Sequence, residues 1–417
     1  MSKIKKIIAR EILNSRAEPT VEAIIELDDK SVGIYSVPTG ASLGKAEAVD
    51  LRDGDPQRYQ GRGVLKALSN IAQVLAPKLI GQEAKNQKEI DDLMLSLDTT
   101  EGISVLGANS ILALSGAIVK AQSASLHLPV YQYIAQVADT DSHKFRIPTP
   151  MFNVVNGGLH AGDNLDFQEF LIVPPMASTY SNNLKFGVEV YYAIKEVLLS
   201  QNLSILVGDE GGYAPTLYAN LGVFKILEES INKAGYKLGL DAFFSLDIAA
   251  SHLKNGAAYR IKDKPVPLSS NDLIEFYVSV NEQYHLLSLE DPLAQDDWDA
   301  WTNITQKLGG EMLIVADDLT CTNPELVQKA ISSRAANAVI IKPNQIGTIS
   351  QTLEVIKSAK AANFKIVVSH RSGETNDNFI ADLAVGVGAD YAKFGAPARG
   401  ERVAKYNRLL EIEHELS

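Results

Sequence analysis

Six residues that could bind a metal or move a proton recur at similar intervals in the second half of the chain. They are Asp247, Glu290, Asp317, Lys342, His370 and Lys393, separated by 43, 27, 25, 28 and 23 residues. Each follows a short apolar run of the kind that forms a buried strand. Three successive carboxylates offer the hard oxygen ligands that Mg²⁺ prefers. A lysine near such a cation could act as a base, because nearby positive charge lowers a lysine pKa.

Each of these residues also has an ordinary structural explanation when it is taken alone. An acidic residue after a strand often caps the following helix. Lys342 precedes Pro343 and could be an exposed loop lysine. Capping does not explain three carboxylates followed by a lysine, a histidine and a second lysine. We therefore interpret the series as one metal-assisted site.

The elements that carry these residues alternate between strand and helix. Apolar runs at 243–246, 286–289, 312–315, 338–341, 365–368 and 391–392 are separated by helical patterns at 271–281, 298–308, 324–333, 349–362 and 377–387. Six successive β-then-α units predict a parallel sheet covered by helices, and so many units in one domain favour a closed barrel. The carboxyl ends of barrel strands meet at one mouth, so we expect the six side chains to converge there.

The first third of the chain has a different pattern and predicts a separate α+β domain. Its elements are alternating apolar runs at 20–27 and 33–37, which predict a hairpin, and helical patterns at 64–79, 88–97 and 108–125. A polar stretch that ends in two prolines follows, at 138–150. We predict an N-terminal domain over 1–137, a linker over 138–147 and a catalytic barrel over 148–417.

Composition excludes several classes of protein. A net charge of −12 argues against a nucleic-acid binder, which would carry a basic face. A single cysteine, Cys321, excludes an intrachain disulfide framework and suits a reducing compartment. The N-terminus lacks the apolar segment of a signal peptide, and the chain has no apolar run of about 18 residues that could span a membrane. These features predict a soluble, cytoplasmic protein.

Three glycine-rich loops carry further polar residues. They are PTGASLG at 38–44 with Ser42, NGGLHAGDN at 156–164 with His160, and VGDEGG at 207–212 with Glu210. Glycine lets the backbone adopt positive φ or approach a ligand closely, and a flexible loop bearing a serine could be a lid. Alone, each string is weak evidence, because a lone histidine is usually structural and PTGASLG could be a linker.

As an ordered set, these strings resemble the enolase (phosphopyruvate hydratase) family along essentially the whole chain. The matching strings are SRAEPT, PTGASLG, LRDGD, NGGLHAGDN, QEF, VGDEGGYAP, SLDIAAS, SLEDPL, ADDLTCTN, IKPNQIGT, SHRSGET and KFGAPARGERVAKYN. The resemblance implies a small α+β domain followed by a modified (β/α)8 TIM-type barrel whose first units are not simple βα repeats. It also implies reversible dehydration of 2-phosphoglycerate to phosphoenolpyruvate, two Mg²⁺ ions per active site and a homodimer.

The resemblance assigns a role to each candidate residue. Asp247, Glu290 and Asp317 match the ligands of the first Mg²⁺, and Ser42 matches a ligand of the second, which arrives with substrate. Lys342 matches the base that removes the C2 proton, and Glu210, with Glu169 beside it, matches the acid that protonates the departing hydroxyl. Arg371 and Ser372 match phosphate ligands, Lys393 a substrate-carboxylate contact, and His160, Gln168 and His370 pocket positions. Glu169, Glu290, Asp317 and Lys342 should also contact the substrate, and His160 should assist catalysis.

Four departures from the family pattern surround this set. Thr39 and Leu43 replace a serine and a threonine in the lid, which predicts slower closure. Leu159 and Phe394 replace polar residues near the site, and we expect them to narrow the pocket. Reduced activity is therefore one expectation from the sequence.

The expected dimer contact is also altered. Arg10 and Glu22 are kept in the N-terminal strands, but Glu411 and His414 stand in the last helix where an arginine and a glutamate are expected. The usual ion pairs between the two elements cannot form, so the sequence predicts a weaker dimer.

Two other functions compete with an active enolase. One is another member of the wider superfamily, such as a muconate cycloisomerase or a racemase, acting on a carboxylate without phosphate. Arg371 in SHRSGET and Ser42 in the lid argue instead for phosphate and a second metal. The other is a degenerate homologue of low activity that serves as a binding protein, at the cell surface for example. The altered lid and Leu159 motivate it, and the complete acid, base and metal set opposes it.

Overall fold

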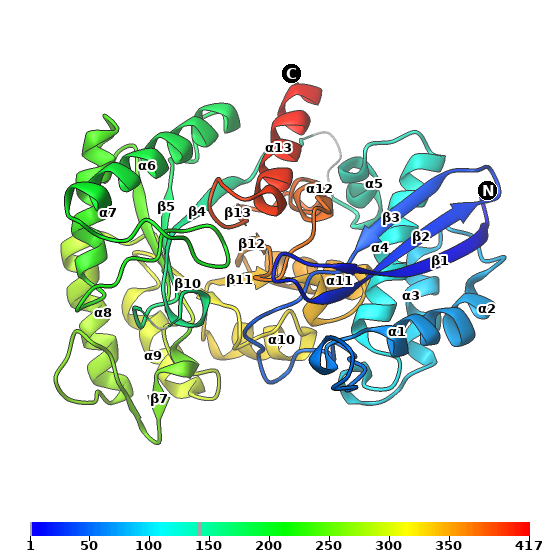
Figure 1. The fold of residues 1–417 in the computed structure, drawn as a ribbon, viewed down its shortest axis with the longest axis horizontal. Coiled ribbons are helices and arrows are strands. Elements are labelled where there is room, and N and C mark those ends of the chain that lie inside the picture. Colours follow the sequence, from blue (N-terminus) through cyan, green and yellow to red (C-terminus); the bar gives the residue numbers. More distant parts are fainter. Residues whose placement is uncertain (1, 141–143, 163) are drawn as a thin grey trace.

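The computed structural model describes residues 2–140, 144–162 and 164–417. Residues 141–143 of the predicted linker and Asp163 of the NGGLHAGDN motif therefore lie outside the described residues. The described chain forms a small sheet covered by helices, followed by a closed barrel surrounded by helices (Figure 1). The predicted combination of an α+β domain and a modified barrel is confirmed.

The N-terminal sheet has three antiparallel strands in the order β1-β2-β3. They are β1 (Ile4–Leu13), β2 (Pro19–Leu27) and β3 (Val32–Ser36). The predicted hairpin corresponds to β2 and β3, with each end within one residue of the prediction. Strand β1 was not predicted, because its charged residues interrupt the apolar pattern, as is common at a sheet edge.

Helices pack on one face of this sheet. They are α1 (Leu65–Asn70), a π-helical turn (Ile71–Leu75), α2 (Ala76–Leu79), α3 (Gln87–Ser96), α4 (Ala108–Ser125) and α5 (Val130–Val137). The single helix predicted over 64–79 is thus interrupted by a π-turn. Helix α4 is buried along most of its length against β2 and β3, and its Gly116 lies so close to the Tyr35 ring that a Cβ would be 2.4 Å from it. The core of the domain therefore lies between α4 and the sheet.

Among the described residues, no single helix is long and apolar enough to cross a membrane. The one pair of helices that is long and apolar enough jointly, α4 with α5, is bent by 109°.

The barrel is closed in the order β10-β11-β12-β13-β4-β5-β6-β9. Its strands are β4 (Thr149–Asn156), β5 (Glu169–Val173), β6 (Phe243–Asp247), β9 (Ser288–Glu290), β10 (Leu313–Ala316), β11 (Ala338–Ile341), β12 (Lys365–Ser369) and β13 (Tyr391–Lys393). Strand β5 is antiparallel to both of its neighbours, whereas the remaining pairs are parallel. The parallel barrel is confirmed from β6 onward, and β5 is the irregular early unit.

Helices surround the barrel, with α6, α7 and α8 at its outer edge (Figure 1). They are α6 (Tyr180–Ser200), α7 (Gly222–Lys233), α8 (Ser270–Tyr284), α9 (Trp298–Leu308), α10 (Pro324–Ser333), α11 (Ile349–Ala361), α12 (Phe379–Gly386) and α13 (Gly400–Glu415). A short hairpin, β7 (Lys254–Asn255) with β8 (Ala258–Tyr259), precedes α8. Asn323 caps α10 through its side chain and Pro324 occupies the first turn, which explains why this helix begins where the sequence predicts.

Candidate active site

Apolar residues fill the barrel interior beneath the candidate site. The interior cluster includes Met151, Val315, Ile340, Val367 and Tyr391. Side chains two residues apart on a strand point to the same face. The residues two positions further along the chain are Asn153, Asp317, Lys342, Ser369 and Lys393. The pleat therefore sets a polar layer on top of an apolar one, at the carboxyl ends of the parallel strands.

A small polar cavity of about 20 Å³ lies at this end of the barrel. It is lined by Ser42, His160, Gln168, Glu169, Glu210, Asp247, Lys342, Ser369, His370, Arg371, Ser372 and Lys393. Of the predicted site residues, only Glu290 and Asp317 do not line it, and each instead contacts a lining lysine. The residues come from the barrel strands, the following loops and the lid, so the structure brings the predicted set together.

Lys393 is the electrostatic centre of one side of the cavity. Its buried ammonium lies 2.9 Å from Asp247 Oδ2, 2.8 Å from Glu290 Oε2 and 3.2 Å from Glu169 Oε2. Burial alone would lower the pKa of Lys393, but the three carboxylates raise it well above its usual value. Lys393 therefore remains an ammonium ion.

Lys342 forms an ion pair with Asp317, whose other oxygen accepts a hydrogen bond of 3.1 Å from Gln345 Nε2. The sequence led us to expect a lowered pKa for Lys342. Burial does act in that direction, but the Asp317 carboxylate outweighs it and raises the pKa of Lys342 above its usual value. The expected neutral amine depends on a cation near Lys342, so it stays a prediction.

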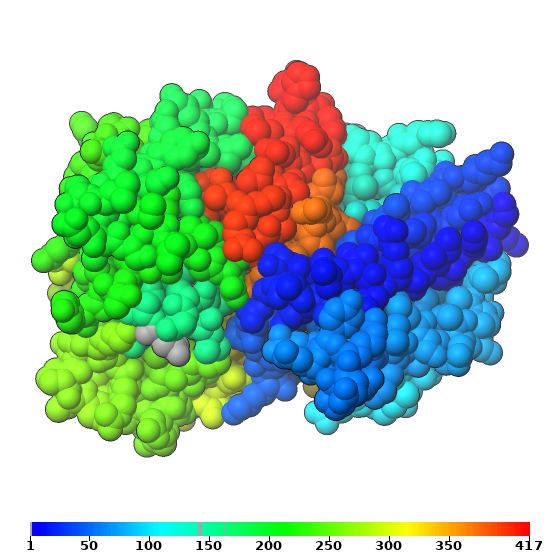
Figure 2. Space-filling view, in the orientation of Figure 1, coloured from blue at the N-terminus to red at the C-terminus, as the bar shows by residue number. Residues whose placement is uncertain are grey.

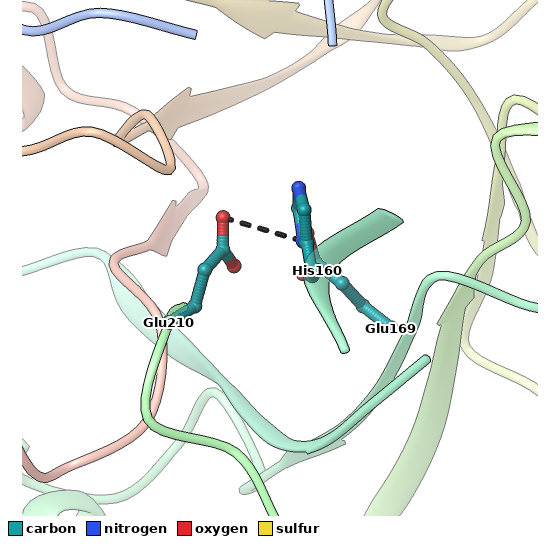
Figure 3. Close-up of side chains that lie close together, drawn as sticks. All are labelled: His160, Glu169 and Glu210. Carbon is teal, nitrogen blue, oxygen red and sulfur yellow. Dashed lines mark ion pairs between the residues drawn. The ribbon is translucent and has the colours of Figure 1, made fainter. Parts of the chain in front are cut away.

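Two carboxylates converge on His160 at another part of the cavity (Figure 3). His160 Nδ1 lies 3.7 Å from Glu169 Oε1 and 3.6 Å from Glu210 Oε1, and all three side chains are buried. Burial and the charge of Glu210 raise the pKa of Glu169 well above its usual value. Burial acts in the same direction on Glu210, but His370 and His160 hold its pKa well below the usual value. The two carboxyl groups of this pair are therefore shifted in opposite directions, with the higher pKa on Glu169.

The loop over 38–44 is docked on the segment that follows β12. Ala41 N donates to Ser372 Oγ at 2.6 Å, and Thr39 and Gly373 exchange two backbone hydrogen bonds of 2.8 Å. Arg371 Nη2 donates to the Ser42 carbonyl at 3.0 Å. In Figure 2 the N-terminal chain lies against the C-terminal half at the centre of the face shown. The loop is therefore held against this segment, with Ser42 lining the cavity.

Two family models match the chain in succession. The model described as "Enolase, N-terminal domain" matches residues 4–134, and the model described as "Enolase, C-terminal TIM barrel domain" matches residues 144–417. The chain is also 47% identical over 416 residues to an enolase of Anaplasma phagocytophilum (strain HZ), across 100% of this chain and 95% of that protein. The chain belongs to the enolase family. As a phosphopyruvate hydratase, this enolase is a carbon–oxygen lyase of glycolysis.

The acidic residues of this enolase fit a divalent cation. Three carboxylates surround the single positive charge of Lys393, and Glu290 Oε1 is buried without a hydrogen-bond partner. Burial and the charge of Asp247 raise the pKa of Glu290 to about 8. Carboxylate oxygens of Asp317, Asp291 and Asp318 also lie within 4.8 Å of one another. Buried carboxylates that outnumber the neighbouring positive charges suit Mg²⁺, which prefers oxygen ligands.

The departures from the family pattern lie outside the cavity. Leu43 is 62% exposed, and Leu159 is 47% exposed beside a neighbouring cleft. Phe394 is fully buried in the core, with its ring 5.9 Å from that of Tyr406. Neither Leu159 nor Phe394 lines the cavity, so the expected narrowing of the pocket is not observed. Thr39 is buried within the lid contact itself.

Sequence reasoning missed several residues that support the site. Glu47 forms a bidentate ion pair with Arg371, with N–O distances of 2.8 and 3.1 Å. Asn153 Nδ2 donates to Glu210 Oε2 at 2.9 Å, and Arg402 contacts His370. Asn153 could have been found, because it lies two positions beyond interior Met151 on a strand. Glu47 and Arg402 carry no local signal, since their partners are distant in sequence.

Proposed function

We propose that this enolase interconverts 2-phosphoglycerate and phosphoenolpyruvate, with Lys342 as the base and the Glu210–Glu169 pair as the acid. The observation that carries the proposal is the position of these groups around one small polar cavity. Strands β11 and β5 are four positions apart in the closed eight-stranded order. Lys342 follows β11 and Glu169 begins β5, so the two groups face each other across the mouth. Removing a proton from one carbon and a hydroxyl from the next requires such a separated base and acid.

The remaining lining residues suit a small phosphorylated carboxylate. Arg371 and Ser372 would bind the phosphate, because a guanidinium group and a hydroxyl are natural phosphate partners. Lys393 would contact the substrate carboxylate with its permanent ammonium charge. His160, Gln168 and His370 would complete the pocket. Ser42 of the lid lines this cavity, so we expect the lid to move when substrate enters.

Asp247, Glu290 and Asp317 would hold one Mg²⁺, and Ser42 would contribute to a second that enters with the substrate. When bound, these cations stabilise the negative charge that develops on the substrate carboxylate as the proton is removed. Lys342 can take that proton once its ion pair with Asp317 is broken, because burial alone lowers the lysine pKa.

An absorbance assay of phosphoenolpyruvate formation from 2-phosphoglycerate, with and without Mg²⁺, tests the proposal. We expect turnover that requires Mg²⁺. No turnover under any metal condition would identify a degenerate homologue with a binding role. Activity on a carboxylate without phosphate would identify a different superfamily reaction.

We also propose a cytoplasmic homodimer, since the family resemblance implies one.

A further inference from the structure

Arg402, in the first turn of α13, is fully buried behind the candidate site. Its Nη1 lies 2.7 Å from His370 Nδ1 and also donates to the Arg371 carbonyl at 2.5 Å. Its Nη2 donates to the Ser372 carbonyl at 2.6 Å and to the Asp209 carbonyl at 3.3 Å. All four N–H groups on these two nitrogens are thus used, one of them on the imidazole ring.

The contact with His370 has only one chemical interpretation. A guanidinium group donates hydrogen bonds, cannot accept them and does not lose its proton in proteins. His370 Nδ1 must therefore be the acceptor, which requires an imidazole without a proton on that nitrogen. A neutral ring then carries its proton on Nε2, which lies 3.1 Å from Glu210 Oε2.

We propose that Arg402 is a positioning residue that holds His370 in the Nε2-protonated tautomer, so that His370 donates a hydrogen bond to Glu210 Oε2. This inference rests on the proposed function only in giving Glu210 an acid–base role. The tautomer itself follows from the contacts of Arg402.

The locked tautomer determines which Glu210 oxygen can carry a proton. Oε2 accepts from His370 Nε2 and, at 2.9 Å, from Asn153 Nδ2. An oxygen that accepts from two fixed donors leaves the other oxygen, Oε1, as the site for a proton. Oε1 lies 3.6 Å from His160 Nδ1, and both Glu210 and His160 line the cavity. A proton supplied by the Glu210–Glu169 pair would therefore pass to the departing hydroxyl through Oε1. The hydroxyl leaves as water with the C–O electron pair, and the pair is left with one proton fewer.

The surroundings of His370 disfavour the doubly protonated ring. An imidazolium would direct its Nδ1–H against the Arg402 N–H and would add charge beside Arg402 and Lys393. Glu210 is the single acidic group that contacts the ring among the described residues. Burial lowers the pKa of His370 most strongly, and the charge of Arg402 lowers it further. The pKa of His370 falls to about 3.

Nitrogen NMR of the full-length enzyme, labelled with ¹⁵N-histidine, tests the tautomer directly. The chain has seven histidines, and a His370→Gln variant assigns the signal by its loss. We expect His370 to show a protonated Nε2 and a bare Nδ1 across neutral pH, with and without Mg²⁺. A proton on Nδ1, or a doubly protonated ring, would overturn the proposal, and this result needs no activity and no Arg402 variant.

Two Arg402 variants then separate positioning from a structural role. Arg402→Lys keeps a donor that cannot accept, so the Nε2 tautomer should persist. Arg402→Met removes the donor and should populate the Nδ1-protonated form. We expect Arg402→Met to lower kcat by about 10- to 100-fold, the effect of losing one hydrogen bond to a charged group, with little change in KM. A folded Arg402→Met that keeps both the wild-type tautomer and kcat would refute the role of Arg402.

Discussion

Two lysines end barrel strands at this site, yet their surroundings suit them to different tasks. Lys393 contacts three carboxylates, so removing its proton would leave several buried negative charges unbalanced. Among the described residues, Lys342 forms an ion pair with Asp317 alone. A cation that binds Asp317 would remove the ion-pair partner of Lys342, whereas Glu169, which is not among the proposed metal ligands, would stay beside Lys393. This difference favours Lys342 as the base.

We expect Lys342→Ala to lower turnover by at least about 10² to 10⁴ while the fold is retained, because a positioned base is lost. The direct measurement is exchange of the substrate C2 proton with solvent deuterium. Lys342→Arg is the matched control, since arginine keeps a positive partner for Asp317 but cannot act as a base. Wild-type exchange in Lys342→Ala would assign the base elsewhere.

The metal assignment is tested by isosteric amides. Asp247→Asn, Glu290→Gln and Asp317→Asn should each weaken Mg²⁺ binding by at least about tenfold, since even changes outside the ligand shell cost that much. Calorimetric titration measures the affinity. Asp91→Asn is a suitable control, because Asp91 is a fully buried carboxylate in the N-terminal domain. Unchanged affinity in all three site variants would disprove the assignment.

Residues whose role follows from their position at a strand end could be predicted from the sequence. Residues that act through contacts with distant parts of the chain could not. Asp247 and Glu290 are neighbours in the β6–β9 register, as expected from their strand-end positions. The ion pair between Glu47 and Arg371 joins positions 324 residues apart, and no local pattern indicates it. The raised pKa of Lys342 likewise depends on its contact with Asp317, which lies 25 residues away and is not indicated by any local pattern.

At the scale of elements, helices with strong end signals were predicted almost to the residue. Helix α9 and helix α10 begin and end where the pattern indicates. The π-turn before α2 leaves no mark in an apolar periodicity, so it was missed. Periodicity also could not indicate that β5 is antiparallel. All of its residues are buried, and a fully buried strand has the same apolar pattern in either direction.

The lid depends on close backbone approach more than on its altered side chains. A Cβ at Gly44 would lie 2.3 Å from Cys321 Sγ, whereas the Leu43 side chain is exposed. We expect Gly44→Ala to hinder docking of the lid and to raise KM or lower kcat about tenfold. Leu43→Thr, the control, should change both by less than about twofold, because position 43 makes little contact.

A second substitution tests the steric explanation for Gly44. Cys321→Ala removes the sulfur that the new methyl group would meet, so the double variant Gly44→Ala/Cys321→Ala should recover most of the lost activity. Steady-state kinetics of the four proteins form a double-mutant cycle. Strictly additive losses would show that Gly44 matters for another reason, such as backbone freedom.

At the scale of the whole molecule, the strength of the proposed dimer depends on the charges of Glu22 and Glu411. Each of these charges is partly balanced by an arginine of the same chain. Glu22 pairs with Arg10 at 2.5 Å, and Glu411 with Arg408 at 3.1 Å. The like charges expected to oppose each other across the interface therefore each have an intrachain partner. Surface pairs of this kind contribute only about 0 to 1 kcal/mol, so some repulsion should remain.

We therefore expect Glu411→Arg to strengthen dimerisation modestly, and most clearly at low salt, where charges are least screened. Sedimentation across a concentration series measures the change. Glu415→Arg is the matched control, because Glu415 lies one turn further along α13, also contacts Arg408 and gives the same change in net charge. If both variants tighten the dimer equally, the cause is the reduced net charge of the protein. If neither does, Glu22 and Glu411 do not face each other across the interface.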